Sequence, residues 1–285
     1  MSLTKQHGKT EDAEDMKPFL KWAGGKYRIV EHIKRRLPSG RRLIEPFVGS
    51  GAVFLNTDYP EYLLSDINQD LIQVYETLKQ HGDTFIAYCK ELFVPENNTP
   101  ERYYALRAEF NETTDTWRKS ALFVYLNRHG YNGLCRYNAN GQFNVPFGRY
   151  KRPYFPEEEM RYFARKAQHA TFVCEDFRVV MGQAQAGDVI YCDPPYVPLS
   201  DTANFTDYAA GGFGPDDQRD LARLATALGE RAIPVLISNH ATDFTEDAYA
   251  AADVERLEVR RFISCDGDNR GTATEVLALF GGTQR

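Results

Sequence analysis

The chain has 285 residues, of which 26% are charged and 42% hydrophobic, with a net charge of −6. This composition excludes a collagen-like, coiled-coil or wholly disordered protein. The acidic residues 1–16 lack the apolar stretch of a signal peptide, and no run of about 18 apolar residues occurs that would span a membrane. The sequence therefore predicts a soluble, cytoplasmic protein with a disordered acidic extension over residues 1–16.

Strands are predicted where short apolar or β-branched runs are bounded by turn residues. These runs are Arg42–Phe47, Tyr62–Asp66, Thr171–Cys174, Asp188–Cys192, Ile233–Ser238, Val254–Ile263 and Glu275–Phe280. Helical patterns separate many of them, for example over 216–231, where Leu221, Leu224 and Leu228 share one face. The alternation predicts an α/β fold with a doubly wound, mostly parallel, seven-stranded sheet.

The pattern changes over residues 69–156. Helices are predicted over 70–79, 84–92, 101–111 and 116–128, and a segment rich in Gly, Asn, Pro and aromatic residues follows them. We interpret 69–156 as an inserted, mainly α domain. Residues 17–68 and 157–285 then form the α/β domain that carries the chemistry.

Basic side chains are concentrated in two blocks. Residues 17–44 hold nine basic residues and one acid, and residues 116–156 hold seven basic residues and no acid. A charge run alone is typical of a solvated face. The second block also contains many Tyr, Phe and Asn residues, which offer base stacking and base-edge hydrogen bonds beside phosphate pairing. This block therefore indicates a nucleic-acid contact.

The five cysteines, Cys89, Cys135, Cys174, Cys192 and Cys265, are scattered and form no C-x-x-C pair. This odd, scattered set favours a reducing compartment and argues against a zinc site. We expect no metal.

A glycine-containing stretch, Glu45-Pro46-Phe47-Val48-Gly49-Ser50-Gly51, follows the first strand. Its glycines permit a tight turn and the close approach of a ligand to the backbone. A dinucleotide fingerprint requires a third glycine where Phe54 stands, which disfavours a nicotinamide oxidoreductase. Asp66 ends the next strand, where it can hold ribose hydroxyls or, since Asn68 and Asp70 follow, cap a helix.

The stretch Ala23-Gly24-Gly25-Lys26 is similar to the end of a phosphate-binding P-loop. Leu20 occupies the first glycine position of that motif, and Tyr27 occupies its Ser/Thr position. These two differences argue against a nucleotide triphosphatase.

A later strand ends in Asp193-Pro194-Pro195-Tyr196. The prolines rigidify this loop and leave a carbonyl without an internal partner. The Asp193 carboxylate and the Pro194 carbonyl can each accept one hydrogen of a planar exocyclic amine such as adenine N6, while Tyr196 stacks on the base. This arrangement directs the nitrogen lone pair toward an electrophile by positioning and electrostatics. A β-to-α turn capped by an aspartate explains Asp-Pro alone, but not the whole tetrapeptide.

These stretches resemble the Dam-type DNA adenine-N6 methyltransferases, which use S-adenosylmethionine. The resemblance runs from Phe19–Lys26 to near Phe280 and covers nearly the whole chain. It implies a methyl-donor site lined by Trp22, Lys26, Phe47, Gly49, Gly51, Asp66 and Asp193, with Asp176 and Phe177 contacting the donor adenine. The family's catalytic residues match Asp193, Pro194, Pro195 and Tyr196.

The resemblance also implies how duplex DNA is bound. Lys21, Leu134, Arg136 and Pro146 match readers of the bases of GATC; Tyr131 and Asn132 match residues around the extruded adenine; and Arg107, Arg149 and Lys151 match phosphate contacts. Asn138 and Tyr150 complete the expected DNA-binding set. Since N6 of a paired adenine is buried in the duplex, the target base must flip out. We expect a monomer associated with the nucleoid.

The turn signal Asn138-Ala139-Asn140-Gly141 lies within the expected DNA-binding segment 131–150. It predicts a β-hairpin or a structured loop there. The chain departs from the family in its acidic extension and in segment 265–274, where Asp266 and Asp268 replace a basic pattern. Both departures concern affinity for the DNA backbone.

Other functions remain open. An RNA or protein amine methyltransferase would use the same pocket, although the basic inserted segment favours duplex DNA. A non-catalytic DNA-binding regulator would be expected to have lost Asp193 or the glycine stretch, and both are present. The sequence is equally compatible with a solitary enzyme of mismatch repair and gene regulation and with the partner of a restriction nuclease.

Overall fold

The computed structural model describes residues 15–197, 212–260 and 272–282. Most of the acidic extension, the end of the strand predicted over 254–263, and Cys265, Asp266 and Asp268 lie outside the described residues. Cys89, Cys135, Cys174 and Cys192 are free thiols. Among the described residues, no helix combines the length and apolarity needed to cross a lipid bilayer.

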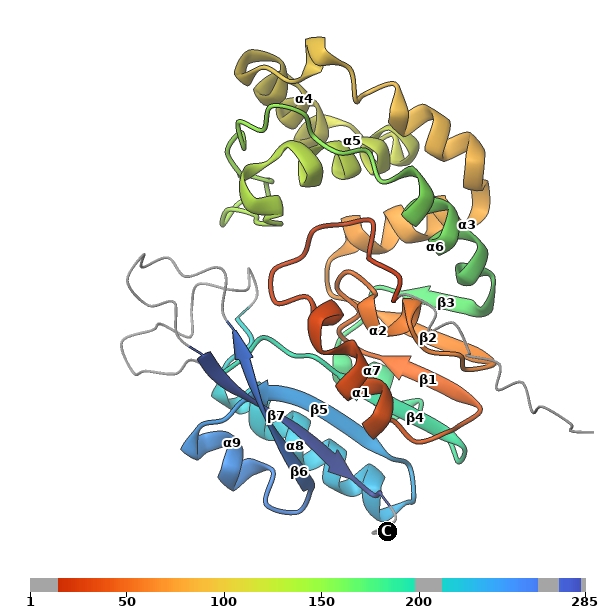
Figure 1. The fold of residues 1–285 in the computed structure, drawn as a ribbon, viewed down its shortest axis with the longest axis vertical. Coiled ribbons are helices and arrows are strands. Elements are labelled where there is room, and N and C mark those ends of the chain that lie inside the picture. The colour runs from red at the N-terminus through yellow and green to blue at the C-terminus, as the bar shows by residue number, and fades with distance from the viewer. Residues whose placement is uncertain (1–14, 198–211, 261–271, 283–285) are drawn as a thin grey trace, which may run out of the picture.

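Within the described ranges, seven strands form one sheet in the order β3-β2-β1-β4-β5-β7-β6 (Figure 1). The strands are β1 Arg42–Glu45, β2 Glu61–Ser65, β3 Ala170–Val173, β4 Asp188–Cys192, β5 Val235–His240, β6 Asp253–Arg260 and β7 Thr272–Phe280. β1 to β5 pair in parallel, and β7 is antiparallel to both β5 and β6. The predicted seven-stranded, mostly parallel sheet is confirmed.

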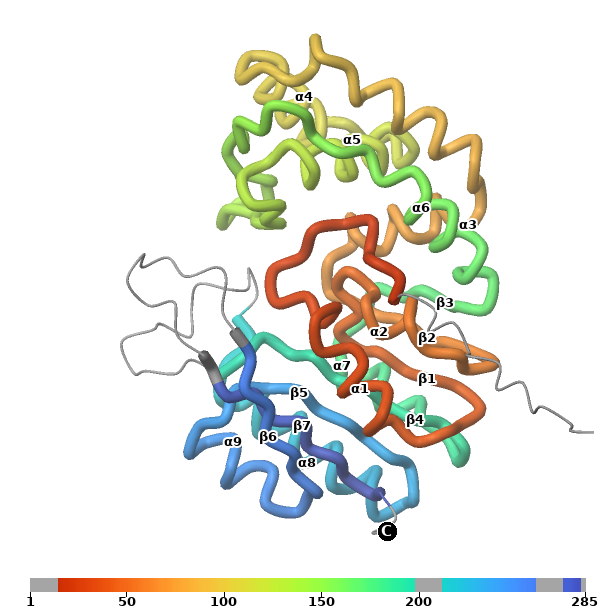
Figure 2. Tube along the Cα trace, in the orientation of Figure 1, coloured from red at the N-terminus to blue at the C-terminus, as the bar shows by residue number. Residues whose placement is uncertain are grey.

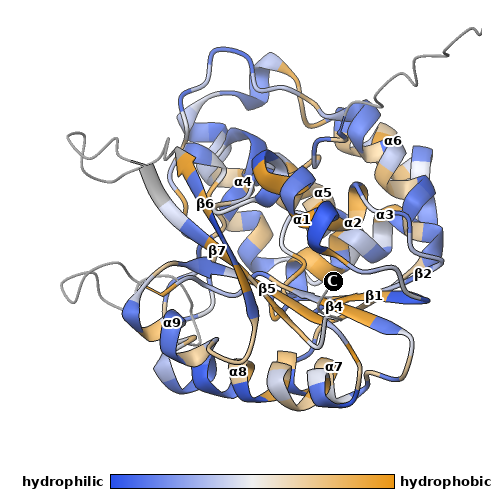
Figure 3. Ribbon diagram, turned by 60° about the horizontal axis from the view of Figure 1, so that its bottom comes forward, coloured by the Kyte–Doolittle hydropathy of each residue, from blue (hydrophilic) through white to orange (hydrophobic). Residues whose placement is uncertain are grey.

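Helices cover both faces of this sheet (Figure 3). α1 Val30–Arg36, α2 Ala52–Leu55, α3 Gln69–Lys90 and α6 Glu157–Lys166 lie on one face, and α7 Phe177–Gly182, α8 Pro215–Glu230 and α9 Asp243–Ala248 lie on the other. Short 3₁₀ segments are Lys26–Ile29, Pro95–Asn97, Tyr131–Gly133 and Ala167–His169. The helices between strands are the crossovers that parallel pairing requires.

Side chains of the central strands alternate between two apolar cores. Leu43 and Val189 pack with the helices of one face, whereas their neighbours Ile44 and Ile190 pack with α7 and α8 on the other. Because successive strand residues point to opposite faces, a strand covered on both sides reads as a continuous apolar run. This is why short apolar runs identified these strands in the sequence.

The helical segment lies beyond one edge of the sheet, at the top of Figure 2. It contains most of α3, together with α4 Pro100–Glu112 and α5 Thr116–His129. The helices predicted over 70–79 and 84–92 are the two halves of α3, which is kinked at Gly82 (φ 46°, ψ −122°). The side chain of Asn68 caps α3 by accepting a hydrogen bond from Leu71 N. Asn68, and not Asp66, therefore caps this helix.

Residues 131–150 form a structured loop with a hairpin-like tip. An isolated bridge joins Tyr137 to Phe143, and a second joins Gly130 to Phe147. At the tip enclosed by the first bridge, Asn138 N donates to Gln142 O at 2.9 Å, and Gly141 has a φ of 72°. The Asn-rich turn is thus formed as expected, but its flanks make no continuous strands.

Candidate active site

The two chemical motifs follow neighbouring strands. β1 and β4 pair in parallel, so the stretch after Glu45 and the loop after Cys192 emerge at the same edge of the sheet. The chain moves outward from this point in both directions, to β2 and β3 on one side and to β5 on the other. Such a switch in strand order leaves a crevice at the carboxyl ends, where α/β sheets bind ligands.

Lys26 joins the amino-terminal segment to the loop after β4. Its Nζ lies 2.9 Å from Asp193 Oδ1 and donates to Gly24 O at 2.5 Å. The same ammonium lies 4.4 Å from the centre of the Tyr196 ring. Since the lysine side chain is only 7% exposed, this buried cation is balanced by Asp193 and stabilised further by the ring.

Asp193 is a hydrogen-bonded, largely buried carboxylate. Its Oδ1 also accepts a hydrogen bond from Ser238 Oγ at 3.1 Å. Desolvation raises the pKa of Asp193, the charge and hydrogen bond of Lys26 oppose this rise, and Glu275 adds to it. The pair with Lys26 therefore favours the ionised acceptor in a site that otherwise favours the protonated acid.

Two strands hold Tyr196. Its hydroxyl donates to Glu275 Oε2 on β7 at 3.0 Å. Its ring packs edge-on against His240 at the end of β5, with 4.6 Å between ring centres. Both contacts restrict the orientation of the aromatic plane next to Asp193.

The glycine stretch after β1 is shaped by Trp22. Gly49 has a φ of 46°, and a Cβ at this position would lie 2.8 Å from the Trp22 indole nitrogen. Gly51 has a φ of 73° and begins α2. Both conformations favour glycine, and the first also brings the indole onto the backbone.

Asp66 supports the same stretch from β2. Its Oδ2 accepts from Gly49 N at 3.1 Å, and its Oδ1 accepts from Asn68 N at 3.0 Å. Desolvation raises the pKa of Asp66, and backbone N–H groups, including those of Asn68 and Gly49, lower it in part. The adjacent side chain, Ile67, is 73% exposed. An exposed apolar side chain thus lies next to a carboxylate at the ligand-binding edge.

An aromatic cluster lines the other side of this edge. The ring centre of Phe47 lies 5.4 Å from that of Phe177 and 5.5 Å from that of Phe213. Asp176 caps α7 by accepting from Arg178 N at 2.8 Å, and its carboxylate also pairs with the Arg178 guanidinium. The structure therefore brings Phe177 to the other expected site residues, whereas Asp176 is engaged locally with Arg178.

Glu45 was not predicted as a site residue from the sequence. It ends β1 and is 2% exposed, and its Oε1 has no hydrogen-bond partner within the described part of the chain. Burial raises the pKa of Glu45 well above its ordinary value, and the charge of Asp193 adds to this rise. The available signal was an acid at the end of a buried strand, where an apolar residue is the norm.

Known proteins match this chain over most of its length. Residues 22–263 match a family described as D12 class N6 adenine-specific DNA methyltransferase. The chain is 55% identical over 262 residues to the DNA adenine methylase of Escherichia coli (strain K12), covering 92% of this chain and 94% of that protein. It is 56% identical over 263 residues to the DNA adenine methylase of Serratia marcescens, covering 92% and 97%. The chain belongs to the D12 class N6 adenine-specific DNA methyltransferases.

Membership of this family makes the chain an adenine-specific DNA methyltransferase. The resemblance stated from the motifs is thereby confirmed, as is the functional class. DNA is the substrate that this class acts on.

Lys21 packs against the structured loop 131–150, although it comes from the start of the chain. Its N–H donates to Asn127 Oδ1 at 2.9 Å, and a Cβ on Gly133 would overlap the lysine side chain. Its Nζ lies 4.0 Å from the centre of the Tyr150 ring. Burial and the charge of Arg128 lower the pKa of Lys21. The first basic block thus meets the second at this residue.

Several expected DNA-binding side chains make contacts within the protein. Arg107 donates to Val145 O at 2.9 Å, and Arg136 Nε donates to Asn144 Oδ1 at 2.7 Å. Asn138 Oδ1 accepts from the backbone of residues 140 and 142 and so builds the turn. These contacts stabilise the conformation of the loop that carries most of the other expected DNA-binding residues.

The remaining members are mostly solvent-accessible. Tyr131 is 51% exposed, and Asn132, Pro146, Arg149 and Lys151 are also exposed, whereas Leu134 and Tyr150 are partly buried. Asn132 N donates to Tyr150 Oη at 3.0 Å. The structure therefore brings most of the expected set together on or directly after one loop, with Arg107 added from α4 and Lys21 from the start of the chain.

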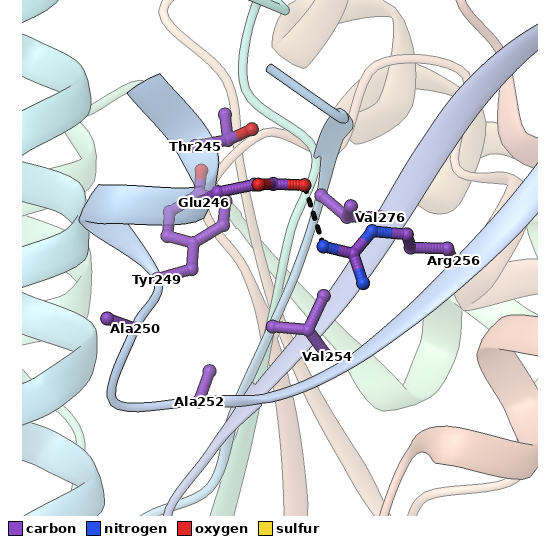
Figure 4. A pocket seen from close by; sticks show the side chains of 8 residues that line it. All are labelled: Thr245, Glu246, Tyr249, Ala250, Ala252, Val254, Arg256 and Val276. Carbon is purple, nitrogen blue, oxygen red and sulfur yellow. Dashed lines mark hydrogen bonds and ion pairs between the residues drawn. The ribbon is translucent and has the colours of Figure 1, made fainter. Parts of the chain in front are cut away.

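A separate cavity of about 110 Å³ lies between α9 and strands β6 and β7 (Figure 4). Its lining is largely apolar, and an ion pair of 2.6 Å between Glu246 and Arg256 closes part of its rim. It holds none of the expected site residues. In the described ranges, no group of three or more His, Cys, Asp or Glu side chains is arranged to hold a metal ion.

Proposed function

We propose that this enzyme transfers a methyl group from S-adenosylmethionine to N6 of an adenine that is flipped out of duplex DNA, within the sequence GATC. The contact between Lys26 and Asp193 at 2.9 Å carries this proposal. It joins the segment expected to hold the donor to the loop expected to hold the amine. Chemistry between two ligands requires such a meeting point.

The residues near the switch in strand order suit S-adenosylmethionine. Glu45 supplies a buried oxygen, Oε1, for which the described residues offer no hydrogen-bond partner, directly before the glycine stretch. Asp66 supplies a carboxylate next to the exposed Ile67, and Phe47 lies with Phe177 nearby. We assign the donor's charged and ribose groups to the acids and Lys26, and its base to the apolar surface. When bound, S-adenosylmethionine supplies an electrophilic methyl group.

On the acceptor side, the loop after β4 makes the adenine amine a nucleophile. Asp193 and the Pro194 carbonyl each accept one N6 hydrogen, which draws the nitrogen lone pair out of the ring. Tyr196 stacks on the base and fixes its plane. The bond from N6 to the methyl carbon forms as that carbon leaves sulfur, and N6 then loses one proton.

We assign recognition of the DNA to residues 69–156, with 17–68 and 157–285 as the catalytic domain. Lys21, Leu134, Arg136 and Pro146 read the bases, while Arg107, Arg149 and Lys151 hold phosphates. Tyr131 and Asn132, which are exposed on the same loop, fill the space left by the flipped adenine. We also propose that the enzyme acts as a monomer in the cytoplasm on nucleoid DNA, without a metal.

The direct test is to sequence methylated adenines in DNA from cells that express the chain and lack their own adenine methylation. Methylation confined to GATC is expected, and cells expressing Asp193→Ala should show none. Methylation at another sequence would contradict the recognition assignment. Methylation of RNA or protein without DNA methylation would contradict the proposed substrate.

Replacing Asp66 with Ala is expected to weaken donor binding by about 1–3 kcal/mol, the cost of leaving charged hydrogen bonds unmade. The substitution also frees Gly49 N from the carboxylate that accepts its hydrogen bond. Calorimetric titration with S-adenosylmethionine measures the effect. Asn68→Ala removes the helix cap and leaves the Asp66 carboxylate in place, so it serves as the control. An unchanged Kd for Asp66→Ala would leave that carboxylate a purely structural role.

Replacing Arg136 with Ala is expected to cost about 1–3 kcal/mol on GATC and to relax discrimination at the guanine, since a guanidinium can grip guanine O6 and N7 together. Replacing Lys151, an exposed expected phosphate contact, should weaken binding to all sequences alike and lower the salt slope by about one unit. Methylation rates on GATC and on duplexes altered at one outer base pair, with binding at several salt concentrations, compare the two. Uniform losses in both variants would mean that Arg136 reads no base.

A further inference from the structure

Asn239 is a fully buried amide whose hydrogen-bonding capacity is completely used. Its Oδ1 accepts from Val197 N at 3.0 Å and from His240 N at 2.9 Å. Its Nδ2 donates to Gln218 Oε1 at 3.1 Å and to Tyr249 Oη at 3.0 Å. Four partners fix the amide in one orientation, because turning it over would set donors against donors.

Gln218 connects Asn239 to the loop after β4. It lies in the first turns of α8 and is 1% exposed. Because its Oε1 accepts a hydrogen bond from Asn239 Nδ2, the other end of the amide, Nε2, lies toward the loop and donates to Pro195 O at 2.7 Å. The two amides therefore form a buried bridge from Pro195 O to Val197 N.

This bridge forms one hydrogen bond to each of the two peptide groups on either side of Tyr196. Pro195 O belongs to the peptide unit that enters Tyr196, and Val197 N belongs to the unit that leaves it. Because each peptide unit is planar, fixing both planes fixes φ and ψ of the residue between them. The Tyr196 hydroxyl is held separately by Glu275, so the backbone and the tip of this side chain are both constrained.

The neighbours of Asn239 act on the same loop. Ser238 Oγ donates to Asp193 Oδ1 at 3.1 Å, and His240 Nδ1 lies 2.8 Å from Val197 O. The carboxyl end of β5 thus contacts the loop at three consecutive positions. Ordinary strand packing does not require three successive polar side chains, two of them fully buried, to face one loop.

We propose that Gln218 and Asn239 are positioning residues, which fix the backbone of Tyr196 so that the flipped adenine stacks with N6 against Asp193 and Pro194. The inference rests on the proposed role of the loop 193–196. Both amides are buried and act on the loop through its backbone groups. Their effect is exerted on the rate of transfer once both substrates are bound, because a displacement of about 1 Å at a reacting group can cost 10²-fold in rate.

The test compares Gln218→Met with Tyr249→Phe. Methionine matches the length of glutamine but cannot donate to Pro195 O. Phenylalanine removes a different partner of Asn239, on the side away from the loop, where Tyr249 packs on Phe280 and lines the cavity near α9 (Figure 4). Both variants disturb the same buried network, but only the first releases Tyr196.

Single-turnover methyl transfer is measured at saturating S-adenosylmethionine on a duplex carrying the sequence found methylated in cells, together with the Kd for the donor and Tm. Gln218→Met is expected to transfer about 10- to 100-fold more slowly with a donor Kd within about twofold of wild type. Tyr249→Phe is expected to lower Tm while keeping the wild-type rate. Equal rates for the two variants would overturn the proposal.

Two further variants keep the result unambiguous. If Gln218→Met lowers Tm more than Tyr249→Phe does, Gln218→Leu replaces it, since leucine also has no donor for Pro195 O and places no charge in this buried site. Asp193→Ala is measured alongside. Failure of the wild-type enzyme to methylate the duplex would refute the proposed function itself, whereas an inactive Asp193→Ala beside a Gln218 variant as fast as wild type would refute only the positioning role.

Discussion

Asp193→Ala is expected to abolish methyl transfer, lowering the single-turnover rate by about 10²–10³-fold or more, as loss of one preorganised electrostatic contact does elsewhere. The substitution removes an acceptor for an N6 hydrogen. It also removes the group that Lys26 and Ser238 hold at 2.9 and 3.1 Å. Transfer of a labelled methyl group to a duplex measures the effect. A rate within about tenfold of wild type, or 1.4 kcal/mol, would contradict the proposed role.

The control for this variant addresses the unpaired lysine. Asp193→Ala leaves the Lys26 ammonium buried with Gly24 O and the Tyr196 ring as neighbours. The double variant Asp193→Ala, Lys26→Met removes both charges, so its stability separates loss of the acceptor from the cost of an unpaired cation. Both proteins are expected to fold. A Tm far below wild type in both would mark Asp193 as structural.

Lys26→Met is expected to lower the transfer rate by about 10²-fold at neutral pH, because the ammonium positions Asp193 and keeps it ionised. The sign of the accompanying pH effect follows from the pKa of Asp193. Burial raises that pKa, and Lys26 is the largest influence that lowers it. Without Lys26 the pKa rises further, so the carboxylate protonates at a higher pH. The acid limb of the rate profile should therefore move upward in pH.

The measurement is kcat against pH at saturating donor and DNA, since Lys26 also belongs to the expected donor site. Lys26→Arg keeps a positive charge and serves as the matched control, with an acid limb close to that of wild type. An acid limb that stays in place in Lys26→Met would show that another group limits the reaction at low pH. A normal rate at high pH together with the shifted limb would assign the whole effect to ionisation.

The sheet was predictable because its strands are buried on both faces. Arg42–Glu45 and Asp188–Cys192 appear in the sequence as short apolar runs between turns, and both form central parallel strands. Local patterns were less informative where a helix is interrupted. α3 was predicted as two helices, and its kink at Gly82 is a local backbone conformation that leaves the two halves in one element.

The sequence left two interpretations of Asp66 open, a ribose-binding residue or a helix cap. The structure excludes the helix cap. Asn68 caps α3, and Asp66 accepts instead from the backbone of residues 49 and 68. An aspartate and an asparagine two residues apart have nearly equal capping preferences, so the sequence could not distinguish them. The difference arises because Asp66 directly follows β2 and its carboxylate contacts the glycine stretch that follows the neighbouring strand.

The sequence by itself determined the chemistry of the loop and the glycine stretch, because both depend on residue types that local backbone geometry requires. Asp193 to Tyr196 and Gly49 to Gly51 each follow a recognisable strand. Only the tertiary structure decided which side chains meet them. Lys26 reaches Asp193, and Gln218 and Asn239 reach Pro195 and Val197, from helices and strands far away in the sequence. Such buried polar contacts leave no local pattern, since they depend on the order in which strands pack and on complementary groups being buried together.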